Sequence, residues 1–279
     1  MGSEVTVNGG QRLHYVDHGG DGPAVVMLHS FLMDGEMFAP QVADLGGEFR
    51  LIAVDERGHG VTPVDAAFSF WDVARDVLGL LDALGLARAA VIGTSQGGFV
   101  GLRMALLAPR RVSALCLLGT SAAAEDARVA AGYRELARTW AVNGPAEQLL
   151  DMVANICLGG MAAPEWKAKW RAVSGPRLIR IMDALVTRDG LLPRLGQVRC
   201  PVLVLHGSAD AAYPVCRGAE IVEAVPHAEP LVLVDGGAHF LSLTDPKAVN
   251  PHLRAFLATH ASRQATVTAG APLPRADLG

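Results

Sequence analysis

Short apolar segments recur along the chain, and stretches with helical character separate most of them. Six of these segments are predicted to be buried strands, because aliphatic and β-branched residues fill them with little polar interruption. They are residues 24–28, 51–54, 89–92, 114–118, 202–205 and 231–234. Strands that alternate with helices in this way predict a mostly parallel sheet with helices on both faces.

Two further strands are predicted near the amino terminus, at residues 4–7 and 12–16. The segment Asn8-Gly9-Gly10 joins them, and an Asn-Gly pair is a strong signal for a tight β-hairpin. With these two strands we expect an eight-stranded α/β sheet that begins with an antiparallel edge.

Helical periodicity is clearest between Trp71 and Leu84. The apolar positions there are three or four residues apart, as one face of an amphipathic helix requires. Gly85 marks the expected end of this helix, because glycine is favoured just beyond a helix carboxyl terminus. A second, buried helix is predicted from Phe99 to Leu107.

Residues 122–197 break the alternation, since they carry helical signals without a clear strand. We interpret them as a helical cap inserted into an α/β core of residues 1–121 and 198–260. The cap contains Trp140, Trp166, Trp170 and Tyr133, which either line an apolar pocket or pack against the core. Residues 261–279 are small, proline-containing and without apolar periodicity, which predicts a disordered tail.

Composition narrows the class of protein. The chain has 279 residues, of which 51% are hydrophobic, but no apolar run reaches the roughly 20 residues of a membrane span. The amino terminus lacks the basic and then apolar pattern of a secretory signal, so we expect a cytoplasmic protein. A net charge of −4 and scattered basic residues argue against nucleic acid as a partner. The sequence leaves open whether the chain forms a homo-oligomer.

The strongest candidate chemistry lies in Gly93-Thr94-Ser95-Gln96-Gly97. A predicted strand precedes this segment and a predicted helix follows it, which is the setting of a nucleophile elbow. The glycines fit a sharp turn in which neighbouring backbone approaches the serine closely. Ser95 is therefore the candidate nucleophile.

A serine nucleophile needs a histidine to accept its proton and a carboxylate to orient that histidine. His239 and Asp210 each follow a predicted strand at its carboxyl end, where ligands bind in open α/β sheets. Glu125 and Asp126 remain alternative acids, whereas Asp235 lies too close to its strand end to reach around the histidine.

Three separated motifs give the chain a specific resemblance, in addition to the order Ser95, Asp210, His239. They are Leu28-His29-Ser30-Phe31, Asp55-Glu56-Arg57-Gly58-His59-Gly60, and Gly207-Ser208-Ala209-Asp210 with Pro214. Together they resemble the motifs of the α/β-hydrolase fold family, in its serine esterase or lactonase-like branch, over about residues 10–260. Ser30 departs from that pattern, because the family usually has glycine there.

The resemblance implies an oxyanion hole formed by the backbone N–H groups of Phe31 and Gln96. Gln96 is also favoured independently, because the first N–H groups of a helix lack partners within the helix. Further candidates for the substrate pocket are Leu32, Trp140, Trp166 and Phe240. No cofactor or metal is expected, and His29, His59 and His206 are interpreted as structural.

These features predict a serine hydrolase that cleaves a small, mainly apolar carboxylic ester or lactone through an acyl-enzyme on Ser95. Family members that resemble dehalogenases and epoxide hydrolases have aspartate at the elbow, so they are set aside. A cofactor-free perhydrolase or haloperoxidase-like enzyme, a carbon–carbon hydrolase and a lyase remain alternatives on the same fold. A non-catalytic ligand receptor is the alternative outside enzymology.

Overall fold

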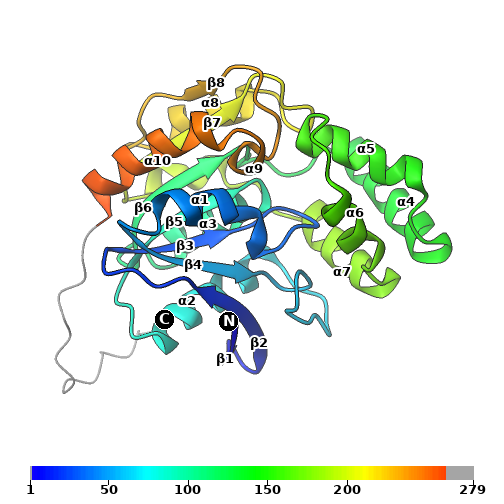
Figure 1. Cartoon of the computed structure of the whole chain (residues 1–279), viewed down its shortest axis with the longest axis horizontal. Helices are drawn as coiled ribbons and strands as arrows, with labels where there is room; N and C mark the ends of the chain where they lie inside the picture. Colours follow the sequence, from blue (N-terminus) through cyan, green and yellow to red (C-terminus); the bar gives the residue numbers. More distant parts are fainter. Residues whose placement is uncertain (1, 262–279) are drawn as a thin grey trace.

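The computed structural model describes residues 2–261, and its centre is an eight-stranded sheet in the order β1-β2-β4-β3-β5-β6-β7-β8 (Figure 1). The strands are β1 Ser3–Val7, β2 Gln11–Asp17, β3 Ala24–Leu28, β4 Arg50–Asp55, β5 Ala89–Thr94, β6 Val112–Leu118, β7 Val202–Gly207 and β8 Val232–Val234. Strand β2 is antiparallel to β1 and β4, and the other pairs are parallel. The predicted α/β class and the antiparallel edge are confirmed.

The hairpin between β1 and β2 follows the glycine signal in the sequence. Val7 pairs with Gln11, and the three residues between them all have positive φ, at 40° for Asn8, 73° for Gly9 and 115° for Gly10. Asparagine and glycine tolerate this backbone region better than other residues. The local sequence therefore determines where the antiparallel edge turns.

Two layers of helices cover the sheet (Figure 1). The helices of the core are α1 Ala39–Leu45, α2 Phe70–Ala83, α3 Gln96–Leu107, α8 Cys216–Ala224, α9 Leu241–Thr244 and α10 Pro246–His260. Helices α1, α9 and α10 contact one another on one face, and α2 contacts α3 on the other. The prediction of helices on both faces is confirmed.

Helix α2 shows how local sequence fixes an element. Ser69 and Asp72 form a capping box at its start, in which each side chain accepts from the backbone N–H of the other residue. Gly85, which follows the helix, has φ of 65°. The observed helix is within one residue of the predicted one at each end.

The segment predicted as a cap, residues 122–197, contains helices and no strand. Its elements are α4 Ala127–Asn143, α5 Glu147–Leu158, α6 Pro164–Arg171, α7 Gly175–Val186 and the 3-10 helix η2 Leu192–Gln197. Helix α4 packs against α7, and the four α helices lie together at one side of the sheet, drawn in green in Figure 1. The chain therefore leaves the sheet after β6 and returns to it at β7.

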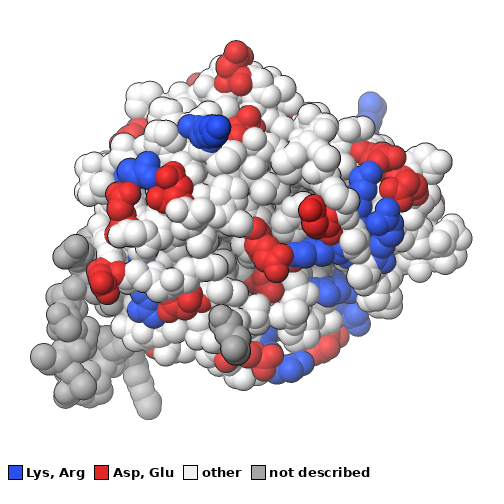
Figure 2. All heavy atoms as spheres, viewed as in Figure 1, with Lys and Arg blue, Asp and Glu red and all other residues white. Residues whose placement is uncertain are grey.

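The surface carries charges of both signs. On the face shown in Figure 2, Lys and Arg side chains are interspersed with Asp and Glu rather than forming a continuous basic stripe. Among residues 2–261, no helix combines the length and the apolar character that crossing a membrane requires. Apart from Ala261, the predicted tail lies outside the described residues.

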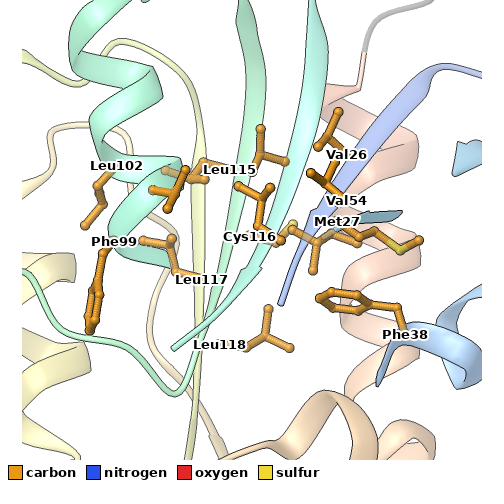
Figure 3. Close-up of a cluster of buried hydrophobic side chains, with 14 of the residues drawn as sticks. Val26, Met27, Phe38, Val54, Phe99, Leu102, Leu115, Cys116, Leu117 and Leu118 are labelled. Atoms are coloured by element: carbon orange, nitrogen blue, oxygen red, sulfur yellow. The ribbon is translucent and has the colours of Figure 1, made fainter. Parts of the chain in front are cut away.

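The core lies between the sheet and its two helical layers. Leu115 and Leu117 of β6 point to the same side as α3, whose Phe99 and Leu102 are buried, because alternate residues of a strand face opposite sides of the sheet (Figure 3). Cys116 and Leu118 face the opposite layer, which contains α10. Burial on both faces makes the central strands rigid supports for the loops at their carboxyl ends.

Candidate active site

Ser95 occupies a strained backbone position at the junction of β5 and α3. Its φ is 50° and its ψ is −107°, a conformation that residues other than glycine rarely adopt. The N–H of Ser95 donates to the carbonyl of Leu118 at 2.8 Å, and the hydroxyl of Thr120 donates to the carbonyl of Ser95 at 2.7 Å. These bonds from the β6 end hold the turn in place.

The glycines of the elbow are required by close backbone contacts. A Cβ atom at Gly93 would lie 2.4 Å from the carbonyl oxygen of Gly97. A Cβ atom at Gly97 would lie 2.0 Å from the carbonyl oxygen of Leu28 on β3. Both distances are far below van der Waals contact, so the turn excludes any side chain at these positions.

Three side chains from separate loops converge at the carboxyl ends of the strands. Nε2 of His239 lies 2.9 Å from Oγ of Ser95, and Nδ1 lies 2.8 Å from Oδ2 of Asp210. Because Nδ1 faces a carboxylate, it carries the ring hydrogen, and Nε2 is free to accept from the serine hydroxyl. The side chains of His239 and Asp210 are only 4% and 1% exposed. The arrangement matches the geometry of a Ser-His-Asp triad.

Asp210 is held by more than its contact with His239. Its Oδ1 accepts from the backbone N–H groups of Ala212 and Tyr213, both at 2.8 Å, and its Oδ2 also lies 3.2 Å from Nε2 of His206. Burial alone raises the pKa of this carboxyl, but the interactions with His206 and His239 outweigh it and lower the pKa well below its usual range. Asp210 is therefore ionised throughout the neutral range.

The alternative acids have other partners. Glu125 accepts from the buried guanidinium of Arg188 at 2.8 Å. Asp126 caps the start of α4, and Asp235 accepts from the hydroxyl of Ser208 at 3.3 Å. Of the acids considered from the sequence, Asp210 is the one in hydrogen-bond contact with His239.

The residues predicted for the oxyanion hole follow two neighbouring strands. Leu28 of β3 pairs with Gly93 of β5, so the loop that contains Phe31 and the start of α3 emerge at the same edge of the sheet. Gln96 is the first residue of α3, and its backbone N–H has no acceptor within the helix. Leu32, directly after Phe31, has φ of 61°.

His29 and His59 make backbone contacts near this loop. Nδ1 of His29 lies 2.8 Å from the carbonyl oxygen of Ser30, and its Nε2 accepts from the N–H of Glu56 at 2.9 Å. Nδ1 of His59 lies 2.9 Å from the carbonyl oxygen of Arg57. Burial lowers the pKa of His59 well below its usual value. The His29 imidazole thus connects the loops that follow β3 and β4, whereas the hydrogen bond of His59 lies within the loop that follows β4.

Glu56 is a buried acid next to the elbow, and its contact was not foreseen from the sequence. Its Oε2 accepts from Nε2 of Gln96 at 2.7 Å. Burial raises the pKa of Glu56 to about 7, although His29 and the hydrogen bond from Gln96 act in the opposite direction. The buried carboxyl of Glu56 therefore holds the side chain of Gln96, the residue that begins α3.

A cavity of about 860 Å³ is lined by residues of α6, of the segment after β3 and of strands β2 and β4, and Ser95, Asp210 and His239 are not among its lining residues. Leu32 and Trp166, two of the predicted pocket residues, contribute to its wall. Trp140 is buried on α4, and the ring of Phe240 is 5.1 Å from that of His239. The predicted pocket residues therefore lie in three different environments.

Arg188 of the insertion reaches the site through Tyr213. The ring of Tyr213 meets that of His239 edge-on at 5.4 Å, and Nη2 of Arg188 donates to the Tyr213 hydroxyl at 3.2 Å. The guanidinium also lies 4.4 Å from the ring centre of Phe99. No sequence motif marks Arg188 or Tyr213. Their contact can be recognised only from the fold.

Comparison with known proteins adds three kinds of similarity. A sequence model of the alpha/beta hydrolase fold matches residues 23–246. An Escherichia coli protein named "Putative carbamate hydrolase RutD" is 29% identical over 250 residues, covering 82% of this chain and 89% of that protein. The dihydrolipoyllysine-residue acetyltransferase component of an acetoin cleaving system from Pseudomonas putida is 31% identical, covering 90% of this chain and 68% of that protein.

Among solved structures, the enol-lactonase from Burkholderia xenovorans superposes with a TM-score of 0.82 at 28% sequence identity, covering 92% of this chain and 100% of the lactonase. An esterase from Thermogutta terrifontis superposes with a TM-score of 0.83 at 24% identity, covering 94% of this chain and 100% of the esterase. At that lower identity the likeness concerns the fold alone.

Proposed function

The chain belongs to the α/β-hydrolase fold family, and on this premise we propose that it is a serine hydrolase that cleaves a small, mainly apolar carboxylic ester or lactone. One observation carries the proposal: Nε2 of His239 is 2.9 Å from Oγ of Ser95 while its Nδ1 is 2.8 Å from Asp210. Hydrogen bonds of this length in this order are what proton transfer from a serine nucleophile requires.

In the first half of the reaction, Oγ of Ser95 attacks the carbonyl carbon while His239 accepts the serine proton. The ionised Asp210 stabilises the imidazolium that forms. The carbonyl oxygen becomes an oxyanion, which accepts hydrogen bonds from the N–H groups of Phe31 and Gln96. When the oxyanion collapses, His239 donates its proton to the leaving alcohol and the acyl-enzyme remains.

In the second half, water replaces the alcohol. His239 accepts a proton from the water molecule, whose oxygen attacks the acyl carbonyl and forms a second oxyanion. Collapse of this intermediate releases the carboxylic acid and returns the proton to Ser95. A lactone follows the same path, except that its alcohol and acid belong to one product molecule.

The substrate class rests on two considerations. The aromatic rings of Tyr213 and Phe240 lie 5.4 Å and 5.1 Å from the ring of His239, which suits a small hydrophobic acyl or alcohol group. Similarity to the Burkholderia enol-lactonase supports including lactones, and similarity to the RutD protein supports including carbamates, in any test of specificity. All three carbonyl classes can use the same nucleophile.

The test compares native protein with Ser95→Ala on p-nitrophenyl esters of short acids, a panel of lactones and a carbamate. We expect hydrolysis by the native protein and a loss of at least about 10³-fold in Ser95→Ala, as removal of a triad serine requires. Ser174→Ala is the matched control, because this exposed serine makes no side-chain bond at the start of α7.

A fluorophosphonate probe gives an independent readout of the nucleophile. Peptide mass spectrometry should find the probe on Ser95 in the native protein and in Ser174→Ala. Native protein that is folded, inactive on the whole panel and unlabelled at Ser95 contradicts the proposal and favours the ligand-receptor alternative. Acyl transfer to peroxide with no hydrolysis would instead favour the perhydrolase alternative.

A further inference from the structure

Helix α6 of the insertion is bonded to the loop that follows β3. The indole Nε1–H of Trp170, which is fully buried, donates to the carbonyl oxygen of Leu32 at 2.9 Å. Nζ of the preceding residue, Lys169, lies 2.6 Å from Oδ2 of Asp34 and 2.7 Å from Oε2 of Glu36. Two consecutive side chains of α6 therefore bond to three residues between β3 and α1, of which Glu36 lies in the 3-10 helix η1 Gly35–Phe38.

The loop is strained at the residue that receives the indole bond. Leu32 has φ of 61°, in the left-handed region where a γ-branched side chain is uncommon. The N–H of Met33 donates to the carbonyl of Ser30 at 3.0 Å, which closes a tight turn around Phe31 and Leu32. A strained turn persists only where surrounding contacts determine it, and Trp170 supplies such a contact.

Phe31, whose N–H is assigned to the oxyanion hole above, lies inside this turn. The Phe31 N–H shares a peptide plane with the Ser30 carbonyl, and the Leu32 carbonyl shares another with the Met33 N–H, which donates to the Ser30 carbonyl at 3.0 Å. A rotation of the plane that contains the Leu32 carbonyl therefore moves the donor that holds the plane of the Phe31 N–H. The indole bond is therefore one residue away from a group that must point at the reacting oxygen.

We propose that α6 positions the oxyanion hole through Trp170 and Lys169, so that the insertion contributes to the chemical step. The proposal rests on the proposed function, because it concerns the same site. Trp170 and Lys169 are positioning residues, since they act on the substrate through Phe31.

Apolar burial and polar bonds act together where α6 meets this segment. Leu32, Trp166 and Trp170 belong to the buried apolar core. Apolar contact is not directional, whereas a hydrogen bond fixes the orientation of its donor and acceptor. The bonds of Trp170 and Lys169 therefore add a defined orientation to the contact between α6 and the loop.

The central test is Trp170→Phe, which keeps an aromatic ring and removes the indole N–H. We expect kcat to fall about tenfold with KM within a factor of two, because full loss of one oxyanion donor reduces kcat about 10²–10³-fold and the donor here is displaced rather than removed. Affinity for a trifluoromethyl ketone should fall in parallel with kcat/KM, since its adduct with serine is also an oxyanion.

Trp71→Phe is the matched control. The indole of Trp71 donates to Asp189 at 3.0 Å from α2, away from the oxyanion loop. This variant loses the same kind of bond, and its kcat and ketone affinity should stay within a factor of two of the native values. Circular dichroism and thermal unfolding establish that both variants are folded.

Lys169→Met is a second test variant, and its result does not depend on whether Trp170→Phe folds. Lys169 is 36% exposed, so its ion pairs are weakened by salt, and we expect kcat to fall about threefold at low salt. Raising the salt to about 1 M should lower kcat of the native protein toward that of Lys169→Met and leave the variant unchanged.

The possible failures are distinguishable. If native protein shows no activity that depends on Ser95, the proposed function is wrong and this inference falls with it. If native activity depends on Ser95 but folded Trp170→Phe keeps native kcat and ketone affinity, only the inference is overturned. A rise in KM alone also overturns it, because that pattern belongs to a residue that affects only substrate binding. Should Trp170→Phe not fold, an unchanged kcat in Lys169→Met overturns it.

Discussion

The Oδ2 atom of Asp210 lies 3.2 Å from Nε2 of His206, a second histidine four residues earlier in the chain. The same Nε2 lies 3.0 Å from the carbonyl oxygen of Tyr213, so the ring hydrogen of His206 is on this nitrogen. One carboxylate oxygen therefore faces two imidazoles. His239 is turned toward the serine, whereas Nδ1 of His206 is buried without a hydrogen-bond partner.

Replacing His206 by glutamine should change how stability depends on pH. Burial lowers the pKa of His206, but its interactions with Asp210 and with the Tyr213 carbonyl outweigh this and raise the pKa above its usual 6.5. A raised pKa stabilises the folded state fully below about pH 6.5, and the benefit is lost as the pH rises through the folded-state value. Urea unfolding should therefore show a larger loss for His206→Gln at pH 5.5 than at pH 8.5.

The control for this prediction removes the carboxylate instead. In an Asp210→Asn background, His206 has no negative charge to face, so the pH-dependent part of the His206→Gln effect should shrink. An effect of His206→Gln that is equal at both pH values in the native background would contradict the proposed charge interaction.

The fold was predictable because its signals are local. All eight predicted strands are present, since uninterrupted aliphatic runs such as residues 24–28 have few alternatives to burial in a parallel sheet. The turn at Asn8-Gly9-Gly10 and the helix ending before Gly85 depend on backbone conformations that these residues favour. Strand ends were the weaker part, and β7 continues two residues past the predicted 202–205.

The site residues that follow strand ends were predictable from the sequence. The contacts that the insertion makes near the site were not. Ser95, Asp210 and His239 follow strands, so their convergence is a consequence of a parallel sheet. Trp170 touches the loop of Leu32 across 138 positions of sequence, and no periodicity encodes such a contact. Apolar composition alone could not assign each tryptophan to core or cavity.

Asp210→Asn should reduce kcat by several hundredfold at least, and by up to about 10⁴-fold. The amide presents an N–H or a weaker acceptor to Nδ1 of His239, which favours the wrong tautomer of the imidazole. Steady-state kinetics on the best ester substrate measures the loss. The corresponding change Glu125→Gln should leave kcat of the folded protein within about tenfold.

Glu125→Gln has its own expected signature. It leaves the charge of Arg188 in a buried setting without a full counter-charge, so it should lower the melting temperature rather than the rate. Should Glu125→Gln lose as much kcat as Asp210→Asn while remaining folded, the assignment of the acid to Asp210 would be wrong.

Glu56→Gln should stabilise the protein progressively as the pH rises. Burial raises the pKa of Glu56 from 4.5 to about 7, so the folded state binds this proton more tightly than the unfolded state. Native stability is therefore lost as the pH rises from about 4.5 to about 7, by about 3 kcal/mol in total for this group. Glutamine keeps the oxygen that accepts from Gln96 but does not ionise.

Urea unfolding at pH 4, 6 and 8 checks this expectation. The free energy of unfolding of Glu56→Gln, relative to the native protein, should rise by about 3 kcal/mol between the first and last pH. A difference that stays constant over this range would mean that burial does not raise the pKa of Glu56, and the contact with Gln96 would then involve an ionised carboxylate at neutral pH.

Gly97→Ala should destabilise the elbow severely. The added Cβ would lie 2.0 Å from the carbonyl oxygen of Leu28, and neither backbone can move without displacing Ser95 or β3. We expect a loss of about 3 kcal/mol or more in the free energy of unfolding, with no probe labelling of Ser95 in any folded fraction.

Gly132→Ala is the matched control, because the exposed Gly132 lies within α4 and its Cβ would meet no atom within 4 Å. That change should stabilise the protein by about 0.5–1 kcal/mol, since alanine is the better helix former. Equal effects of the two substitutions would show that backbone contact with Leu28 does not determine the residue at the elbow.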